Sequence, residues 1–241
     1  MPGNDDDILG KIIELILNLP PDAKGEVRLP TERILAANLN IQRPTVRERL
    51  STLETLGFIS RTQGRGTYLT MASSSVIQLY FEIAMKLGYI SVEEMQSAME
   101  MIVREAAASA AVSASAENIR LLARAVEREG DDGSADAMVT SQFEFHSLLV
   151  RASGNPVIVL IFDGIAVVVR EVLRRKIRVM QMVAGALNRN LEARRYIVEA
   201  IQNREPDTTR TAVEEYFWLW RREEAKISIL NYGEGHFGNG Q

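Results

Sequence analysis

The sequence predicts a mainly α-helical protein in two parts: an N-terminal winged helix-turn-helix unit and a C-terminal all-helical antiparallel bundle. Three observations support this fold class. Two β-prone runs flank one glycine-containing turn, Gln63-Gly64-Arg65-Gly66, and no other such pair occurs. From residue 75 onward we find helical punctuation and no strand alternation. Aromatic residues make up 6% of the chain and apolar residues 46%, which favours an aliphatic core packed between helices.

The first two helices of the N-terminal part are marked by local signals. Residues 5–19 place apolar side chains on one helical face, and Pro20 and Pro21 end this helix. Thr31 is a good N-cap for the second helix. The candidates for burial on this second helix are Ile34, Leu35 and Leu39.

The third helix is the centre of the N-terminal unit. Pro44 suits a first helical position, and Gly57 is a natural stop. Its apolar face is expected to hold Val46, Leu50, Leu53 and Leu56. Its opposite face carries Thr45, Arg47, Glu48, Arg49 and Thr52, with Arg43 just before the helix. The residues 58–62 and 67–70 then predict the two strands of the wing.

The charge of this unit indicates contact with DNA. From Arg28 to Thr70 there are seven Lys/Arg and three Asp/Glu, a local charge of +4 in a chain of net charge −4. Arginine can donate two parallel hydrogen bonds to guanine, and threonine hydroxyls can hold phosphates. A solvated arginine surface is the plainer alternative for any one of these residues. Their combination on a short helix after a turn predicts a major-groove reader.

Bulk properties exclude several classes of protein. The chain has 241 residues and no cysteine, so disulfides and thiolate metal sites are excluded and a cytoplasmic location is expected. The first ten residues are acidic, unlike a secretory signal. The longest apolar run, residues 157–169, is interrupted by Asp163 and Gly164 and is too short for a membrane span. No membrane association is expected.

The domain boundaries follow from composition. We expect a DNA-binding domain at 1–72, an all-helical domain at 73–228, and a flexible tail at 229–241, with residues 71–75 as the linker. The bundle should hold seven helices, at about 75–88, 92–114, 116–129, 135–152, 156–182, 188–203 and 207–227. Ser91 and Glu94 predict a capping box for the second of these.

The motifs LPTER, RPTVRERL, LGFI and QGRGTY resemble the winged helix-turn-helix of the GntR family of bacterial transcription regulators. The remainder resembles the FadR branch of that family, whose C-terminal FCD domain is an all-helical bundle that binds an effector. This resemblance implies DNA contacts from seven positions. They are Arg33, Arg43, Thr45, Arg47, Gln63, Gly64 and Arg65. Arg43 and Arg47 would read guanines, and the wing tip would lie in the minor groove.

The resemblance also points to four positions in the bundle. Many FCD domains hold a divalent metal with one aspartate and three histidines. At these positions the present chain has Gln142, His146, Arg194 and Tyr216. Only His146 is a normal transition-metal ligand, and Arg194 is a permanent cation. We therefore predict no metal and no other cofactor.

Arg194 suggests a different way to bind an acidic effector. A guanidinium pairs a carboxylate with two parallel hydrogen bonds, and Gln142, His146 and Tyr216 would complete the polar site. The alternative is an Arg194 paired internally, for example with Glu105 or Glu144, in a pocket that binds nothing. Met101 stands where the family usually has an arginine, which leaves an acyl thioester as a second candidate effector.

Together these features predict a homodimeric transcription regulator that binds a palindromic operator and acts as a repressor released by an organic acid. An enzyme is not expected, because neither a catalytic motif nor a nucleophile–base pair is found. An effector-independent DNA-binding protein is the remaining alternative.

Overall fold

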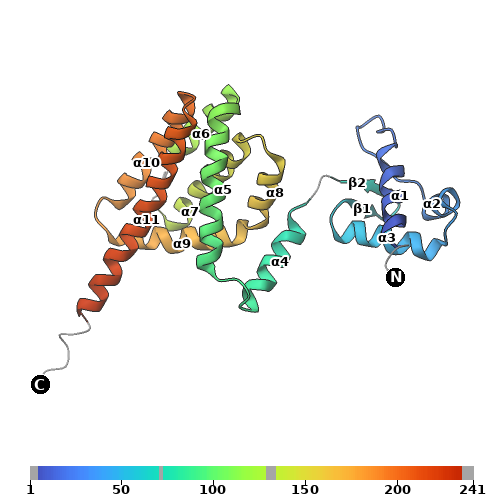
Figure 1. Cartoon of the computed structure of the whole chain (residues 1–241), viewed down its shortest axis with the longest axis horizontal. Helices are drawn as coiled ribbons and strands as arrows, with labels where there is room; N and C mark the ends of the chain where they lie inside the picture. Colours follow the sequence, from blue (N-terminus) through green and yellow to red (C-terminus); the bar gives the residue numbers. More distant parts are fainter. Residues whose placement is uncertain (1–4, 71–72, 129–133, 235–241) are drawn as a thin grey trace, which may run out of the picture. The chain divides into compact units, whose positions relative to one another are not determined.

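The computed structural model describes residues 5–70, 73–128 and 134–234, and the chain separates into two compact units, Met1–Val76 and Ile77–Gln241 (Figure 1). The units thus meet a few residues after the boundary expected at 72. Residues 71 and 72 of the expected linker lie outside the described residues, and helix α4 already begins at Ser75.

The N-terminal unit has the predicted helix, turn, helix and wing. It comprises α1 (Asp5–Leu17), α2 (Glu32–Leu39), α3 (Arg43–Thr55), β1 (Ile59–Thr62) and β2 (Gly66–Leu69). The strands are antiparallel, with Ile59 opposite Leu69 and Thr62 opposite Gly66. The core contains Ile12, Ile16, Leu29, Leu35, Val46, Leu50, Leu53 and Ile59.

Two residues expected in this core are exposed. Ile34 is 42% exposed, because its neighbour Leu35 occupies the inward position of α2. Leu56 is 39% exposed, because α3 ends at Thr55 and the chain then turns through Gly57 at φ 78°. Successive residues on a helix point about 100° apart, so a short helix buries only the positions directly over the core.

The C-terminal unit is all-helical over its described residues. It comprises α4 (Ser75–Lys86), α5 (Val92–Ser113), α6 (Ala116–Glu127), α7 (Ala135–Ala152), α8 (Pro156–Gly164), α9 (Ala166–Met182), α10 (Ala186–Gln202) and α11 (Pro206–Glu234). The capping box of α5 is present, since Ser91 Oγ accepts from the Glu94 N–H and Glu94 accepts from the Ser91 N–H.

Two predictions about these helices are wrong. The helix expected at 156–182 is two helices, because it is interrupted at Ile165. The described part of the bundle therefore has eight helices instead of the expected seven. A Cβ on Gly164 would lie 2.3 Å from Ile77 Cγ2, so the break coincides with the close approach of α4. The last helix, expected to end at 227, continues as α11 to Glu234, so residues 229–234 of the expected tail are helical. Residues 235–241, with His236, lie outside the described residues.

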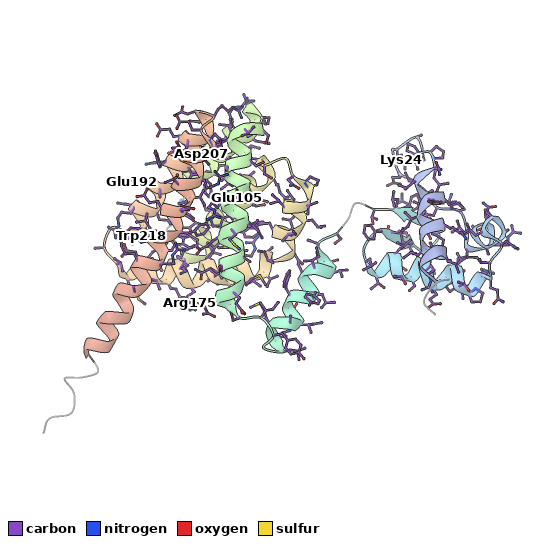
Figure 2. The ribbon with its side chains drawn as sticks, in the orientation of Figure 1. Lys24, Glu105, Arg175, Glu192, Asp207 and Trp218 are labelled. Atoms are coloured by element: carbon purple, nitrogen blue, oxygen red, sulfur yellow. The ribbon has the colours of Figure 1, made fainter. Side chains whose placement is uncertain are left out.

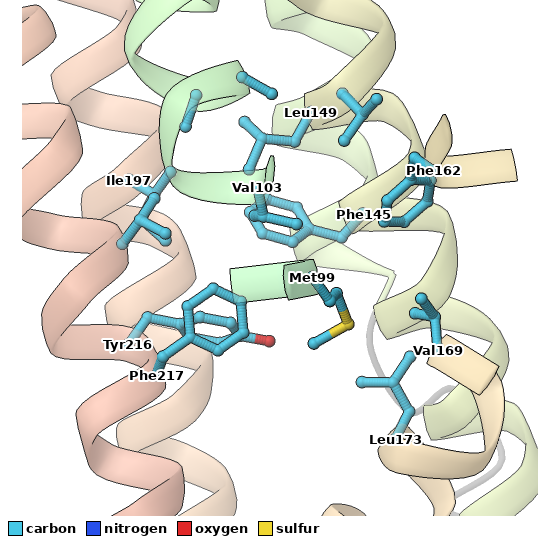
Figure 3. Packing of buried hydrophobic residues seen from close by; sticks show 14 of the residues in the cluster. Met99, Val103, Phe145, Leu149, Phe162, Val169, Leu173, Ile197, Tyr216 and Phe217 are labelled. Carbon is cyan, nitrogen blue, oxygen red and sulfur yellow. The ribbon is translucent and has the colours of Figure 1, made fainter. Parts of the chain in front are cut away.

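The core of the bundle lies between α5, α7, α9, α10 and α11. Figure 3 shows Met99 and Val103 of α5 beside Phe145 of α7 and Tyr216 of α11. Alanines of α5 such as Ala107, Ala110 and Ala111 are fully buried. Small side chains allow helix axes to approach closely, so the alanine-rich stretch serves packing. The ring centroids of Tyr216, Phe217 and Trp220 of α11 lie 5.7, 6.0 and 5.9 Å from that of His146 of α7.

Candidate DNA interface and effector site

Helix α3 buries Val46 and Leu50 and exposes Arg43 and Arg47. Val46 and Leu50 are at most 2% exposed, whereas the Arg43 and Arg47 side chains are 59% and 60% exposed. Thr45 is half-buried beside them. Two exposed guanidinium groups in the first turns of a well-anchored helix have the placement that reading a major groove requires.

The wing and α2 present the other predicted DNA-contacting residues. Arg33 is exposed on α2, and Gln63, Gly64 and Arg65 are exposed at the wing tip. Gly64 has φ 79°, which a residue with a side chain adopts at a cost, and nothing stands within 4 Å of the position a Cβ would take. The Tyr68 hydroxyl donates to the Arg65 carbonyl over 3.2 Å, which braces the tip.

Glu32 and Arg61 belong to the same surface, although no sequence motif marks them as part of it. The Glu32 carboxylate accepts from Arg47 Nη2 at 2.9 Å and lies 3.4 Å from Arg43 Nε. It also lies 3.7 Å from Arg61 Nη1 of the wing. Glu32 and Arg47 are 15 positions apart, so no helical or strand periodicity connects them.

The bundle brings the four predicted effector residues into one buried region. Gln142 and His146 come from α7, Arg194 from α10 and Tyr216 from α11, and each is 0% exposed. His146 Nε2 and the Tyr216 hydroxyl form a hydrogen bond of 3.1 Å, and Gln142 Nε2 donates to Asn190 Oδ1 over 3.2 Å. Below, the polar cluster means Gln142, His146, Asn190, Arg194 and Tyr216. Asn190 had no motif that could have marked it.

Burial sets the protonation of the polar cluster. It lowers the pKa of His146 to about 3 and raises the pKa of the Tyr216 hydroxyl. It also lowers the pKa of Arg194 to about 10. At neutral pH the imidazole is therefore neutral, the phenol is protonated and the guanidinium remains charged. Among the described residues, His146 Nδ1 has no hydrogen-bond partner. The cluster offers one cation and several neutral donors, which suits an anion.

The donors do not suit a metal ion. Among the described residues, no three His, Cys, Asp or Glu side chains are gathered in a way that could hold one. Within the polar cluster only His146 is a usual ligand for a transition metal, and Arg194 would repel a cation. The absence of a metal cofactor stays a prediction from the chemistry of these side chains.

The internal partners suggested for Arg194 face solvent. The Glu105 carboxylate binds Arg104 Nε at 3.1 Å and Arg210 Nη2 at 3.3 Å on the outside of α5 (Figure 2), and Glu144 is exposed on α7. Met101 is 54% exposed and lines a surface groove of about 540 Å³ beside Trp218 of α11. Met101 thus lies outside the polar cluster.

None of the helices in the described part of the chain has the length and apolar character needed to cross a membrane.

Two family models match the chain in consecutive segments. The model described as bacterial regulatory proteins, gntR family, matches residues 8–69. The FCD domain model matches residues 94–217, more than half of the chain. The first segment holds the exposed arginines of α3 and the wing, and the second holds every member of the polar cluster.

Similar proteins are transcription regulators. The chain is 26% identical over 222 residues to the HTH-type transcriptional repressor NanR of Enterobacter sp. (strain 638), covering 87% of this chain and 81% of that protein. It is 28% identical over 157 residues to the uncharacterized HTH-type transcriptional regulator YcbG of Bacillus subtilis (strain 168), covering 61% and 63%. A solved GntR structure from Streptococcus agalactiae has a TM-score of 0.62 at 23% identity, covering 90% of this chain and 99% of that one, which shows a shared fold.

Proposed function

The chain belongs to the GntR family of bacterial transcription regulators with a C-terminal FCD domain, and we propose that it is a repressor released from a palindromic operator by an organic acid. It is thus a DNA-binding regulator that responds to a small molecule. A repressor is proposed because the relative from Enterobacter carries that name. Since the family consists of regulators, we assign no catalytic activity, and a chromosomal target implies a cytoplasmic location.

The exposed arginines of α3 are the observation that carries the DNA half of the proposal. Arg43 and Arg47 are exposed while Val46 and Leu50 of the same helix are buried, so the arginines can enter a groove without disturbing the core. Gln63, Gly64 and Arg65 would lie in the minor groove, Arg33 would contact the DNA backbone and a base, and the Thr45 hydroxyl would hold a phosphate. Each bidentate arginine–guanine contact contributes about 1–3 kcal/mol of discrimination between bases.

A palindromic operator requires two copies of the chain, and α4 offers a surface for pairing them. Leu79 and Ile83 of α4 and Leu87, the residue after its end, recur at steps of four and are 56%, 47% and 59% exposed. Tyr80 adds a further large exposed side chain at 67%. An apolar stripe of this size on one helix is typical of a surface that another subunit covers. We propose a homodimer that pairs through α4.

Selection of genomic DNA tests the DNA half of the proposal. Sheared DNA from the source organism is passed over the purified protein, and the retained fragments are sequenced. We expect a few enriched fragments that share a short palindrome, lost with Arg47→Ala and kept with Arg120→Ala, an exposed arginine of α6. Uniform retention of all fragments by all three proteins would mean binding through charge alone and would contradict the proposal.

The polar cluster is the observation that supports an acidic effector. Its five side chains come from three helices and are shielded from water, where hydrogen bonds and charge interactions are stronger than at the surface. A carboxylate would accept from Arg194 while Tyr216, Asn190 and Gln142 bind its remaining atoms. An effector reaching these residues must separate α7, α10 and α11. It then shifts operator affinity by its preference for that separated arrangement.

Binding of organic acids tests this site. A panel of carboxylic acids chosen from the genes beside the operator is screened by thermal stabilisation, and the best one is measured by calorimetry. We expect Arg194→Ala to weaken binding at least about tenfold. Arg195→Ala should have no effect, because Arg195 is an exposed neighbour that pairs with Glu127. Affinity for Arg194→Ala within about twofold of wild type, under about 0.5 kcal/mol, would contradict the site.

Complete burial of the polar cluster favours one alternative, a regulator without an effector. In that case the cluster is only part of the core. No carboxylic acid or acyl thioester would then raise the melting temperature of the protein or change its affinity for the operator.

A further inference from the structure

The Glu32 carboxylate is the centre of the positive surface on the N-terminal unit. Arg47 engages it with two nitrogens, Nε at 3.1 Å and Nη2 at 2.9 Å. Arg43, like Arg47, lies on α3, and its Nε is 3.4 Å from Glu32 Oε2. Arg61 lies on β1, and its Nη1 is 3.7 Å from Glu32 Oε1. One anion therefore holds three cations that come from two different elements.

The position of Glu32 keeps it ionised and fixed. It is the first residue of α2, where the partial positive charge of the helix N-terminus favours a carboxylate. The hydrogen bond from Arg47 lowers the pKa of Glu32, and Arg43 and Arg61 lower it further. Its side chain is only 19% exposed, while those of Arg43 and Arg47 are about three times more exposed. The anion lies beneath the guanidinium groups that face outward.

A carboxylate and a guanine edge compete for the same part of an arginine. Both present two acceptors that one edge of a guanidinium can engage side by side. Arg47 already uses its Nε and Nη2 atoms on Glu32. Guanine can replace this interaction with an equivalent pair of hydrogen bonds. A phosphate can also accept two hydrogen bonds from one guanidinium, but it carries a negative charge, which the Glu32 carboxylate beneath repels.

We infer that Glu32 is a specificity-determining residue, whose carboxylate weakens binding to arbitrary DNA more than binding to the operator. This inference rests on the proposed operator contacts of Arg43 and Arg47. Glu32 orients Arg43 and Arg47 before binding and removes one unit of positive charge from their surface. Arg61 is shared with Glu54, whose Oε2 lies 3.1 Å from its Nε. The sequence-independent attraction to phosphates falls accordingly, and guanine contacts remain available.

Replacement of the charge by an amide tests the inference. Affinity is measured for the most enriched genomic fragment and for a shuffled duplex of the same composition. We expect Glu32→Gln to bind the shuffled duplex at least threefold more tightly. The slope of the logarithm of its binding constant against the logarithm of the salt concentration should be steeper by about 0.9, the value for one more phosphate contact. The ratio of the two affinities should fall at least threefold. The far-ultraviolet circular dichroism spectrum confirms that the variant is folded.

Two controls separate the charge at this position from other causes. Glu14→Gln removes an exposed carboxylate of α1, outside the predicted DNA-contacting residues, and should leave the ratio unchanged. Glu32→Asp keeps the charge and should keep the weak binding to the shuffled duplex. An unchanged ratio in Glu32→Gln, or equal effects of all three substitutions, would overturn the inference. A wild-type protein without preference for its selected fragment would instead contradict the proposed function.

Discussion

At the scale of single residues, Arg194 is a charged group placed where water cannot reach it. Burial lowers its pKa from 12.5 to about 10, which corresponds to a cost on the order of 3 kcal/mol for the charged form. Phe145 lies beneath it, with the guanidinium carbon 5.6 Å from the ring centroid. A protein that maintains such a cost at one position is expected to use the charge there.

Removal of this charge should stabilise the protein while it abolishes effector binding. Arg194→Met has a similar length and needs no hydration, so we expect the free energy of unfolding to rise by about 2 kcal/mol. Urea denaturation measures this change. Arg195→Met is the matched control on the exposed side of the same helix and should change stability by less than about 0.5 kcal/mol. A loss of stability in Arg194→Met would mean that the guanidinium contributes to the fold.

His146 predicts a pH dependence of stability. Its pKa is about 3 in the folded protein because of burial, whereas an exposed histidine has a pKa near 6.5. Between these values the unfolded chain binds a proton that the folded protein does not, so stability falls as pH falls. From pH 7 to pH 5 the loss should be about 2 kcal/mol.

The variant His146→Gln isolates this effect. Glutamine stays neutral and can still hydrogen-bond to Tyr216, so the decrease between pH 7 and pH 5 should shrink by about 2 kcal/mol. Urea denaturation at the two pH values gives the comparison, and His236 is present in both proteins and cancels. An equal decrease in the two proteins would show that His146 is hydrated and titrates normally.

At the scale of elements, the break between α8 and α9 lets α4 approach the bundle closely. Ile77 lies against Gly164, and Gln78 Nε2 donates to the Asp163 carbonyl over 2.7 Å. Local sequence signals did not reveal the break, since the apolar run continues through it. The contact that explains it involves residues 87 positions apart.

A methyl group at Gly164 should displace α4. We expect Gly164→Ala to lower the free energy of unfolding by about 2 kcal/mol, because the new Cβ would overlap Ile77 Cγ2. Chemical denaturation followed by circular dichroism measures the change. Adding Ile77→Ala should recover part of the loss. Gly10→Ala in α1 is the control, since no atom stands within 4 Å of the position its Cβ would take. Alanine favours a helix over glycine by about 0.5–1 kcal/mol, so this variant should not lose stability.

At the scale of the whole molecule, function depends on pairing two chains and on coupling the bundle to the DNA-binding unit. The exposed stripe on α4 belongs to the first helix after the DNA-binding unit. A dimer formed through this stripe would place chain pairing and the coupling of the bundle to the DNA-binding unit on the same helix.

Charges placed on this stripe should separate the dimer without unfolding the chain. Leu79→Glu alters a side chain that is 56% exposed, so we expect a folded monomer, with a dissociation constant raised at least about 100-fold. Sedimentation velocity at micromolar concentration measures this. Val112→Glu, 71% exposed near the end of α5, should leave the oligomeric state unchanged. A dimer that persists in Leu79→Glu would place the interface on another face.

Local patterns were sufficient for the fold class and for the residues of the recognition helix. Caps such as Thr31 and Ser91, and the spacing of Val46, Leu50 and Leu53, act within one or two turns of chain and can be recognised there. The meeting of Gln142 with Asn190, the grouping of three arginines around Glu32 and the break at Ile165 all required the folded chain. These features join residues from different elements. Whether a polar side chain is buried, and which partner it finds there, depends on the packing of helices and not on the residues beside it in the sequence.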